Sequence, residues 1–428
     1  MRTVYTKISG AKASAVALAT ALVLVGWSAG ASAQVAQSDY TAGYVVLPKV
    51  IVHTTGGTPA VMPGEEATDT LIQITNTNQA EQITVDCWWV NANKHCGTDQ
   101  GPICETNADC PIGLQCVQGW AVADFQIILT PGQPIGFAAS SGIPVGEMPC
   151  DPGFPGPNCQ TDAGGSVREV PEDPFRGELK CVQVDENDVP VLANDLKIEA
   201  TVISTTVGGG VATLAAAYNG VGFTAESIAS VPPAAGDPLC LGSLPPGTPP
   251  SVECAATYAP CPGILHFEHF FENAVTELGS RVHTDLTLVP CSEDLGEPED
   301  QANLSVTAQM LVYNEFEQRF STNSRVQCYQ ATRLSDIDTQ PGPSGDAFSI
   351  FNVGVQGTIT GQTRIRGVRG PDGELGYGLL GVGCEDHAAA AGGQTLATAA
   401  FNLQHVGFRA EGDAVYTTQF PPGPPVGP

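Results

Sequence analysis

Two histidines three positions apart are the first residues of this chain whose types could bind a metal ion. They stand in the segment His266-Phe267-Glu268-His269. Zinc proteases use the spacing H-E-x-x-H on a helix, which this segment lacks. The segment instead repeats the pattern of Val50-Ile51-Val52-His53, a core strand by composition. Since positions three apart on a strand point to opposite faces, we predict a structural strand and no metal site.

Acidic residues gather in two turns and could offer oxygen ligands to calcium. One turn holds Asp185 and Asp188, and the other begins with Glu293 and Asp294. Calcium prefers flexible, oxygen-rich loops, but neither segment has the D-x-[DN]-x-[DN]-G arrangement of an EF-hand. Calcium, the one cofactor these residues suggest, and plain solvated turns are both open at this point.

Adjacent tryptophans on an alternating stretch point to opposite sides of the chain. Trp88 shares its side with Asp86, which suggests an outer face, whereas Trp89 points inward. An exposed Trp88 would offer a stacking platform for a sugar or a protein. The alternative, which we favour, is that the cysteine-rich loop that follows folds over Trp88 and buries it.

Three arginines lie within six residues of an otherwise acidic chain. Arg364 and Arg366 share one strand face, and Arg369 follows. Guanidinium groups bind carboxylates and phosphates well, so an anion or an acidic partner is one interpretation. The interpretation we favour is pairing with carboxylates of the protein itself.

Catalytic motifs find little support in this sequence. It contains no G-x-S-x-G elbow, no P-loop and no G-x-G-x-x-G after a strand. The carboxylates of a glycosidase come from distant strands and cannot be recognised by spacing. We therefore predict a protein that is not an enzyme, with a hydrolase as an alternative.

Fourteen cysteines follow the first 80 residues, and none forms a C-x-x-C unit. In an exported chain this usage indicates disulfide bonds, with local pairing expected within 96–116 and across 150–159. We predict that all of the cysteines form disulfides: Cys87, Cys96, Cys104, Cys110, Cys116, Cys150, Cys159, Cys181, Cys240, Cys254, Cys261, Cys291, Cys328 and Cys384.

The first 33 residues have the pattern of a secretory signal peptide. Arg2, Lys7 and Lys12 precede an apolar run, and Ala31-Ser32-Ala33 is a cleavage site. Removing these three basic residues would change the formal charge from −28 to −31. Such a charge disfavours nucleic acids and anionic membranes as partners. We expect a secreted protein, periplasmic or extracellular, with no membrane insertion.

Short alternating segments with frequent turns predict an all-β protein. Several patterns occur twice in the same order, for example Ala216-Ala217-Tyr218-Asn219 and Ala399-Ala400-Phe401-Asn402. This repetition predicts two tandem antiparallel β-sandwich domains that arose by internal duplication. Strands are expected at 70–76, 83–87, 124–129, 179–184, 196–203, 285–289, 304–313, 349–359 and 362–368.

Composition sets the expected boundaries of the domains. The first sandwich covers 34–230, with a cysteine-rich insert at about 93–119 and a Pro/Gly loop at about 143–176. A Pro/Cys-rich linker covers 231–262, the second sandwich covers 263–420, and residues 421–428 form a disordered tail.

Two segments resemble parts of known extracellular proteins. The stretch 70–85 resembles the strand-turn-strand of bacterial extracellular immunoglobulin-like adhesion and surface domains, where an Asn-rich turn follows an alternating strand. The stretch 107–116 resembles short Asp-Cys-Pro-x-Gly-x-x-Cys modules in secreted proteins of environmental bacteria. The resemblance implies an immunoglobulin-like fold and an extracellular location, and carries no catalytic residues.

These observations favour a secreted, non-enzymatic structural or adhesive protein of the cell surface or extracellular space. Its expected partners are further copies of itself, other surface proteins or glycans. A soluble carbohydrate- or calcium-binding protein is the first alternative, and a secreted hydrolase with unrecognised loop carboxylates is the second.

Overall fold

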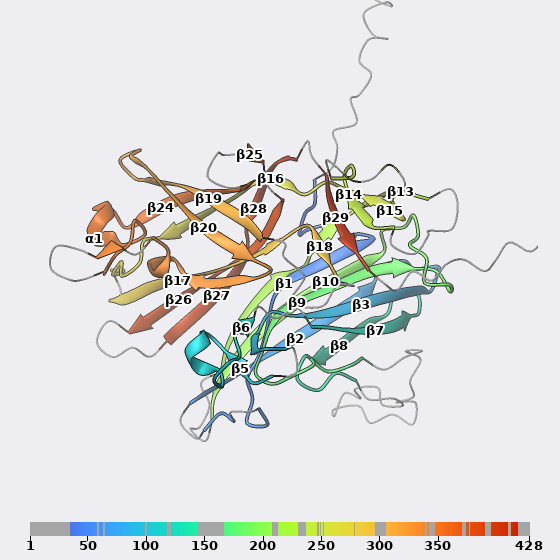
Figure 1. Ribbon diagram of the computed structural model, residues 1–428, viewed down its shortest axis with the longest axis horizontal. Helices are drawn as coiled ribbons and strands as arrows, with labels where there is room; N and C mark the ends of the chain where they lie inside the picture. Colours follow the sequence, from blue (N-terminus) through green and yellow to red (C-terminus); the bar gives the residue numbers. More distant parts are fainter. Residues whose placement is uncertain are drawn as a thin grey trace, which may run out of the picture. The chain divides into compact units, whose positions relative to one another are not determined.

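The computed structural model shows an all-β protein (Figure 1). It describes residues 35–417 except 58–59, 63–64, 99–100, 118–120, 144–166, 208–212, 230–236, 246–247, 249, 251, 278, 296–304, 339, 342–346, 370–373, 376, 390–394 and 410–411. The predicted signal peptide, the C-terminal tail, Cys150 and Cys159 lie outside the described residues. The described residues belong to one compact unit.

The first half of the chain builds two antiparallel sheets that face each other. One sheet has five strands in the order β12-β1-β9-β3-β7, and the other has four in the order β11-β10-β2-β8. These strands are β1 (Tyr44–Val52), β2 (Glu66–Asn76), β3 (Ile83–Asn91), β7 (Val122–Leu129), β8 (Pro134–Ala138), β9 (Phe175–Val184), β10 (Leu196–Thr206), β11 (Thr213–Asn219) and β12 (Val221–Phe223).

The second half builds two sheets with a matching strand order. Its sheets run β20-β19-β24-β16-β28, with β25 beside β24, and β21-β17-β26-β27. These strands are β16 (Pro262–Phe270), β17 (Ser280–Pro290), β19 (Ser305–Asn314), β20 (Arg319–Gln327), β21 (Gln330–Arg333), β24 (Thr360–Arg369), β25 (Glu374–Leu375), β26 (Leu379–Ala389), β27 (Thr395–Asn402) and β28 (Gln404–Phe408).

The strand registers of the two halves also agree. Cys87 of β3 lies opposite Cys181 of β9, and the two form a disulfide. At the matching place in the second half, Met310 of β19 lies opposite Ile365 of β24. Both pairs are buried. An apolar pair therefore fills in one half the position that a disulfide fills in the other.

A third sheet draws its strands from both halves of the chain. Its order is β13-β15-β14-β29-β18, and it contains parallel as well as antiparallel pairs. Segment 231–262, which we expected to be a linker, contributes β14 and β15 to it. The strands are β13 (Ala225–Ile228), β14 (Leu239–Leu241), β15 (Ala256–Tyr258), β18 (Glu293–Asp294) and β29 (Asp413–Tyr416).

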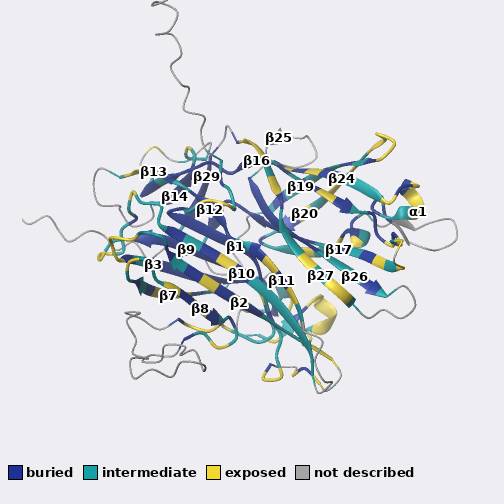
Figure 2. Cartoon of the chain, turned by 180° about the vertical axis from the view of Figure 1, so that it is seen from behind, coloured by how far each residue is buried: buried dark blue, intermediate teal, exposed yellow. Residues whose placement is uncertain are grey.

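Apolar side chains fill the space between sheets on both sides of the first five-stranded sheet. In Figure 2, β1, β3 and β9 of this sheet are coloured mostly as buried. Alternation within β2 directs Ile72 and Ile74 into the first core, where they meet Val85 and Trp89 from the facing sheet. The opposite face packs under the third sheet. A separate core fills the second sandwich.

One predicted strand is wrong. Residues 349–359 form a bend and the short helix α1 (Val353–Gln356). The side chain of Asn352 accepts a hydrogen bond from the backbone N–H of Gly354, and Gly357 ends the helix in the left-handed conformation at φ 69°. These are the two local signals that start and stop a helix. No helix in the described part of the chain is long and apolar enough to span a bilayer.

Five disulfides form among the described residues. The bonded pairs are Cys87–Cys181, Cys96–Cys110, Cys104–Cys116, Cys240–Cys254 and Cys261–Cys291. The two pairs within 96–116 confirm the expected local bridging.

The prediction that Cys328 and Cys384 form disulfides is wrong, because both are buried thiols. They belong to different apolar cores, Cys384 between the first two sheets and Cys328 beneath the third sheet. Cys384 hydrogen-bonds the side chain of Lys49 from the other half of the chain.

The two halves meet through matching positions of the repeat. The side-chain N–H of Asn402 donates to the carbonyl of Asn219 at 2.6 Å, and the backbone N–H of Asn219 donates to Asn402 Oδ1 at 3.1 Å. Val382 and Cys384 of β26 also belong to the core of the first sandwich. The halves therefore share both hydrogen bonds and apolar packing.

We predict that Asn402→Ala lowers the free energy of unfolding by about 1–3 kcal/mol, because the half-buried backbone of Asn219 loses both partners. Urea unfolding of the purified protein measures the change. Asn219→Ala is the matched control, since Asn219 contributes its backbone to these bonds, and should stay within about 0.5 kcal/mol of wild type. Equal losses in both variants would contradict this account of the contact.

Candidate functional site

An open cleft of ≈ 600 Å³ lies at one end of the second sandwich. It forms where β16, β19 and β24 end, because the antiparallel register brings Glu268, Gln362 and Tyr313 into one row across the three strands. Glu385 of β26 reaches the cleft from the facing sheet. Three neighbouring strands and one strand of the other sheet thus contribute to its wall.

Carboxylates and aromatic rings alternate along the lining of this cleft. Phe270 and Tyr313 supply rings, and Glu268, Glu317 and Glu385 supply carboxylates. Such a lining can stack against an apolar or sugar ring and accept hydrogen bonds from hydroxyl or cationic groups.

Some polar groups at the cleft are already engaged. Glu315 accepts hydrogen bonds from the backbone N–H and hydroxyl of Thr360, which lower the pKa of Glu315. His269 contacts the Thr363 hydroxyl through Nε2 at 2.8 Å, and burial lowers the pKa of His269 to about 4. A neutral histidine held this way suits a structural role.

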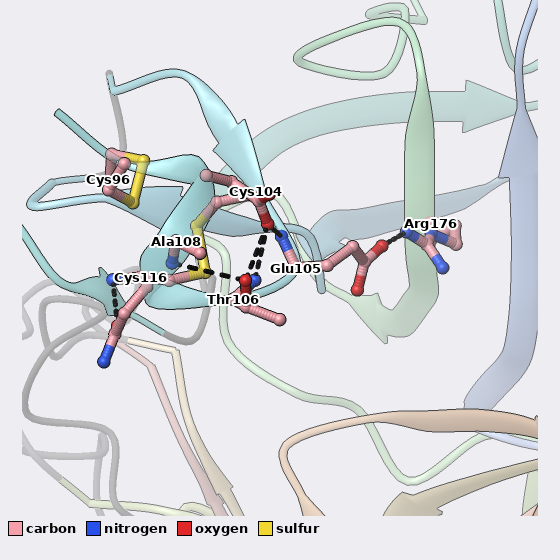
Figure 3. Close-up of a disulfide and its surroundings, with 10 residues drawn as sticks. Cys96, Cys104, Glu105, Thr106, Ala108, Cys116 and Arg176 are labelled. Atoms are coloured by element: carbon pink, nitrogen blue, oxygen red, sulfur yellow. Dashed lines mark hydrogen bonds and ion pairs between the residues drawn. A yellow bond between two sulfur atoms is a disulfide. The ribbon is translucent and has the colours of Figure 1, made fainter.

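The cysteine-rich insert is the second candidate region, and Figure 3 shows its disulfides and the residues around them. Its three short strands, β4 (Lys94–Cys96), β5 (Ile103–Cys104) and β6 (Cys116–Val117), form a small sheet. The Cys96–Cys110 disulfide ties β4 to the end of a 3₁₀ turn that Thr106 and Asp109 cap reciprocally, and the Cys104–Cys116 disulfide joins β5 to β6. Ile112 and Leu114, which lie between Cys110 and Cys116 in the chain, are exposed.

A half-buried carboxylate anchors the insert to the first sandwich. Glu172 accepts hydrogen bonds from the side chains of Asn91 and Asn93, each at 2.6 Å, and lies 3.1 Å from His95 Nε2. Partial burial by itself would raise the pKa of Glu172, but the contacts with His95, Asn93 and Asn91 lower it. A more exposed ion pair between Arg176 and Glu105 adds a second attachment (Figure 3).

The structure does not place Trp88 on the surface. Its side chain is 3% exposed and lies in the core beneath the third sheet, so it cannot act as a stacking platform. Burial was the alternative we favoured, but that core contains no residue of the cysteine-rich insert. Asp86, which had suggested an outer face, is itself buried, and burial raises its pKa to about 6.

Arg364 and Arg366 lie on the outer face of the six-stranded sheet of the second half. The guanidinium of Arg364 lies 5.8 Å from the ring centroid of Tyr313, and Arg366 Nε donates to Gln309 Oε1 at 2.7 Å. Within the described part of the chain, neither arginine pairs with a carboxylate. The side chain of Arg369 lies outside the described residues.

The four calcium candidates do not form one site. Asp185 closes its turn by accepting hydrogen bonds from the backbone N–H groups of Asn187 and Val189, and Asp188 accepts one from Gln126. Glu293 is buried and contacts a lysine, whereas Asp294 next to it is half-buried. Calcium binding by Asp185, Asp188, Glu293 and Asp294 stays a prediction.

Two features escaped the sequence-based analysis. Most of the cleft residues lie on β16, β19 and β24, which are not consecutive in the chain, so their spacing in the sequence does not reveal the cleft. The lysine that Glu293 contacts is Lys180, which lies two positions after Glu178 on β9. Glu178 and Lys180 alternate with the apolar residues Leu179 and Cys181 of β9, and this pattern was the signal that could have been recognised.

His266 and His269 confirm the prediction of a structural strand. They lie on β16 and point to opposite faces, His269 being buried and His266 contacting Gln404. They therefore do not converge on a metal.

Comparison with known proteins adds no functional assignment. No protein-family model matches this chain, and no curated protein matches it either. Among solved structures, the CupB6 tip adhesin from Pseudomonas aeruginosa aligns over 88% of this chain and 99% of its own, at 10% identity and a TM-score of 0.12. A TM-score this low carries no argument about fold or function.

We predict that Glu172→Ala loosens the insert and lowers the free energy of unfolding by about 1–3 kcal/mol, because three buried or half-buried side chains lose their acceptor. Since the folded-state pKa of Glu172 is depressed, its contribution is present above the unfolded value of 4.5 and is lost as the pH falls below it. Thermal unfolding between pH 3 and pH 7 tests both statements.

The control for this variant is Glu105→Ala, which removes only the exposed ion pair to Arg176. It should cost less than about 1 kcal/mol. If Glu172→Ala behaves like Glu105→Ala across the pH range, Glu172 is not the anchor of the insert.

Proposed function

We propose that this protein is an exported, non-enzymatic structural or adhesive protein, and that its halves arose by duplication of an immunoglobulin-like sandwich. The matching strand order and the matched pairs Cys87–Cys181 and Met310–Ile365 support the duplication. Disulfides persist in oxidising compartments outside the cytosol, which supports export. The role is that of a rigid module at the cell surface or in the extracellular space.

The feature that supports an adhesive role is the cysteine-rich insert. Two disulfides and an internal capping box fix a short segment whose tip presents Ile112 and Leu114 to solvent. Exposed apolar groups on a rigid support can bind a partner at little cost in conformational entropy. A second copy, another surface protein or a glycan-bearing surface are the proposed partners.

We expect the native protein in the cell-surface or pelletable fraction, and we expect the double variant Ile112→Asp/Leu114→Asp to move into the soluble fraction. Charged groups at the tip oppose apolar contact, while exposed substitutions leave stability within about 0.5 kcal/mol. Fractionation followed by reducing and non-reducing gels makes the measurement. Leu192→Asp, at another exposed apolar position, is the control.

A freely soluble wild-type monomer whose gel mobility changes only with reductant would refute the assembly role. Unchanged fractionation of the double variant would show that the insert is not the contact surface, even if the protein is surface-bound.

The cleft supports carbohydrate binding as a second candidate function. The feature that supports this function is the row of Tyr313, Gln362 and Glu268 across three strands, with Phe270 beside it. Aromatic rings flanked by amide and carboxylate groups match the mixed apolar and hydroxyl faces of a sugar.

We predict that Tyr313→Ala weakens binding of any glycan retained on a glycan array by about tenfold or more, which corresponds to losing about 1.4 kcal/mol. Tyr313→Phe, which keeps the ring, should retain most of the affinity. Calorimetry with the retained glycan provides the comparison. A blank array, or equal affinities for both variants, would remove the cleft as a sugar site.

A hydrolase remains the least supported proposal, because the histidine at the cleft is buried and held by hydrogen bonds. Turnover of a polymeric substrate that disappears on mutating Glu268 or Glu385 would establish it.

A further inference from the structure

A lysine and two glutamates meet in the core between the first five-stranded sheet and the third sheet. Glu178 and Lys180 lie two positions apart on β9 and so share one face, and Glu293 lies on β18. Nζ of Lys180 is 2.9 Å from Glu178 Oε2 and 2.5 Å from Glu293 Oε2. All three side chains are about 1% exposed.

The surroundings of these groups are apolar. Tyr44, Trp88 and Cys328 belong to the same buried core. Within the described part of the chain, the four carboxylate oxygens of Glu178 and Glu293 have no partner besides the ammonium of Lys180, which contacts the two Oε2 atoms. Charged groups in such a place are costly unless every oxygen is satisfied.

The charges of the three groups do not balance. One ammonium cannot neutralise two carboxylates, so a second proton must reside on the cluster for it to be neutral in the dry interior. Burial raises the pKa of Glu178 and of Glu293, against the attraction of Lys180, which agrees with a proton held there. Burial by itself would lower the pKa of Lys180, but Glu178 and Glu293 raise it, so the neutral amine is a minor form. It arises when the ammonium proton passes across the 2.5 Å contact to Glu293, which leaves one neutral amine and two carboxylic acids.

We propose that Lys180 and Glu293 condense to an isopeptide bond, with Glu178 as the group that transfers protons. The Nζ lone pair attacks the carboxyl carbon of Glu293, and Glu178 protonates the hydroxyl that leaves as water. Glu178 then takes a proton from the nitrogen, so that it ends as it began. One amine and one carboxylic acid give one amide and one water, and no oxidant or cofactor is needed.

The choice of Glu293 over Glu178 follows from the geometry. Glu293 makes the shorter contact, at 2.5 Å against 2.9 Å for Glu178, and Glu178 lies on the same strand as Lys180. The product removes the buried ion pair. It also ties β9 of the first half to β18 of the third sheet, between positions 180 and 293 of the chain.

The test is the intact mass of the exported wild-type protein after full reduction and denaturation. We expect a mass about 18 Da below that of the mature sequence, the loss of one water. Cyclisation of an N-terminal Gln34 would release ammonia, about 17 Da, so the site must be located by peptide mapping.

Trypsin provides that location. An acylated Lys180 resists cleavage, so the peptide that begins after Arg176 should run on to Lys197 and carry, as a branch, the peptide between Arg281 and Arg319. A wild-type protein of full mass, or normal cleavage after Lys180, would overturn the proposal. Both results come from the wild-type chain and do not depend on a variant folding.

Variants distinguish bond formation by Lys180 from proton transfer by Glu178. Glu178→Gln keeps both bonding groups but removes the proton transfer, so most molecules should retain the full mass, whereas Lys180→Arg should abolish the branch. Glu186→Gln, in the exposed turn after β9, is the matched control and should be cross-linked like wild type. A Glu178→Gln protein that is folded by circular dichroism and cross-linked as fully as wild type would refute the role of Glu178.

Discussion

The first five-stranded sheet is buried on both faces, and the rest of the structure depends on this. Nearly every residue of β1, β3 and β9 is buried. An antiparallel sheet commonly leaves one face to water, but here the apolar side chains of both faces need a cover. The four-stranded sheet covers one face and the third sheet covers the other. Because the third sheet takes strands from the middle and the end of the chain, the two halves close into one unit.

The larger sheet of the second half, which contains β19 and β24, differs from this sheet in how its faces are covered. Its strand β19 alternates between half-buried and buried positions, as expected for a sheet with one open face. Offsets between the repeated segments align Trp88 with Leu311 and Lys180 with Arg364. Trp88 and Lys180 are buried in the first half, whereas Arg364 lies exposed beside Tyr313 in the second. Matching positions of the two sheets therefore differ in chemistry because the face of the first sheet has a cover and that of the second does not.

Surface features are added to this scaffold by segments that do not disturb its registers. The cysteine-rich insert leaves after β3 and returns before β7, which pair with each other without a shift. Its disulfides replace the core that so short a segment cannot build. The cleft likewise lies at strand ends, where the backbone turns and side chains of several strands converge. Rigid sheets thus hold both candidate contact regions in fixed positions.

Local patterns in the sequence were sufficient to predict the all-β class, most strands, the bridging within the insert and the structural role of His266 and His269. These properties depend on alternation and spacing over a few residues, which the chain itself displays. The burial of Trp88, the thiols of Cys328 and Cys384, and the meeting of Lys180 with Glu293 depended on which sheet covers which face. That is decided by contacts between residues far apart in the chain, and only the tertiary structure brings those residues together.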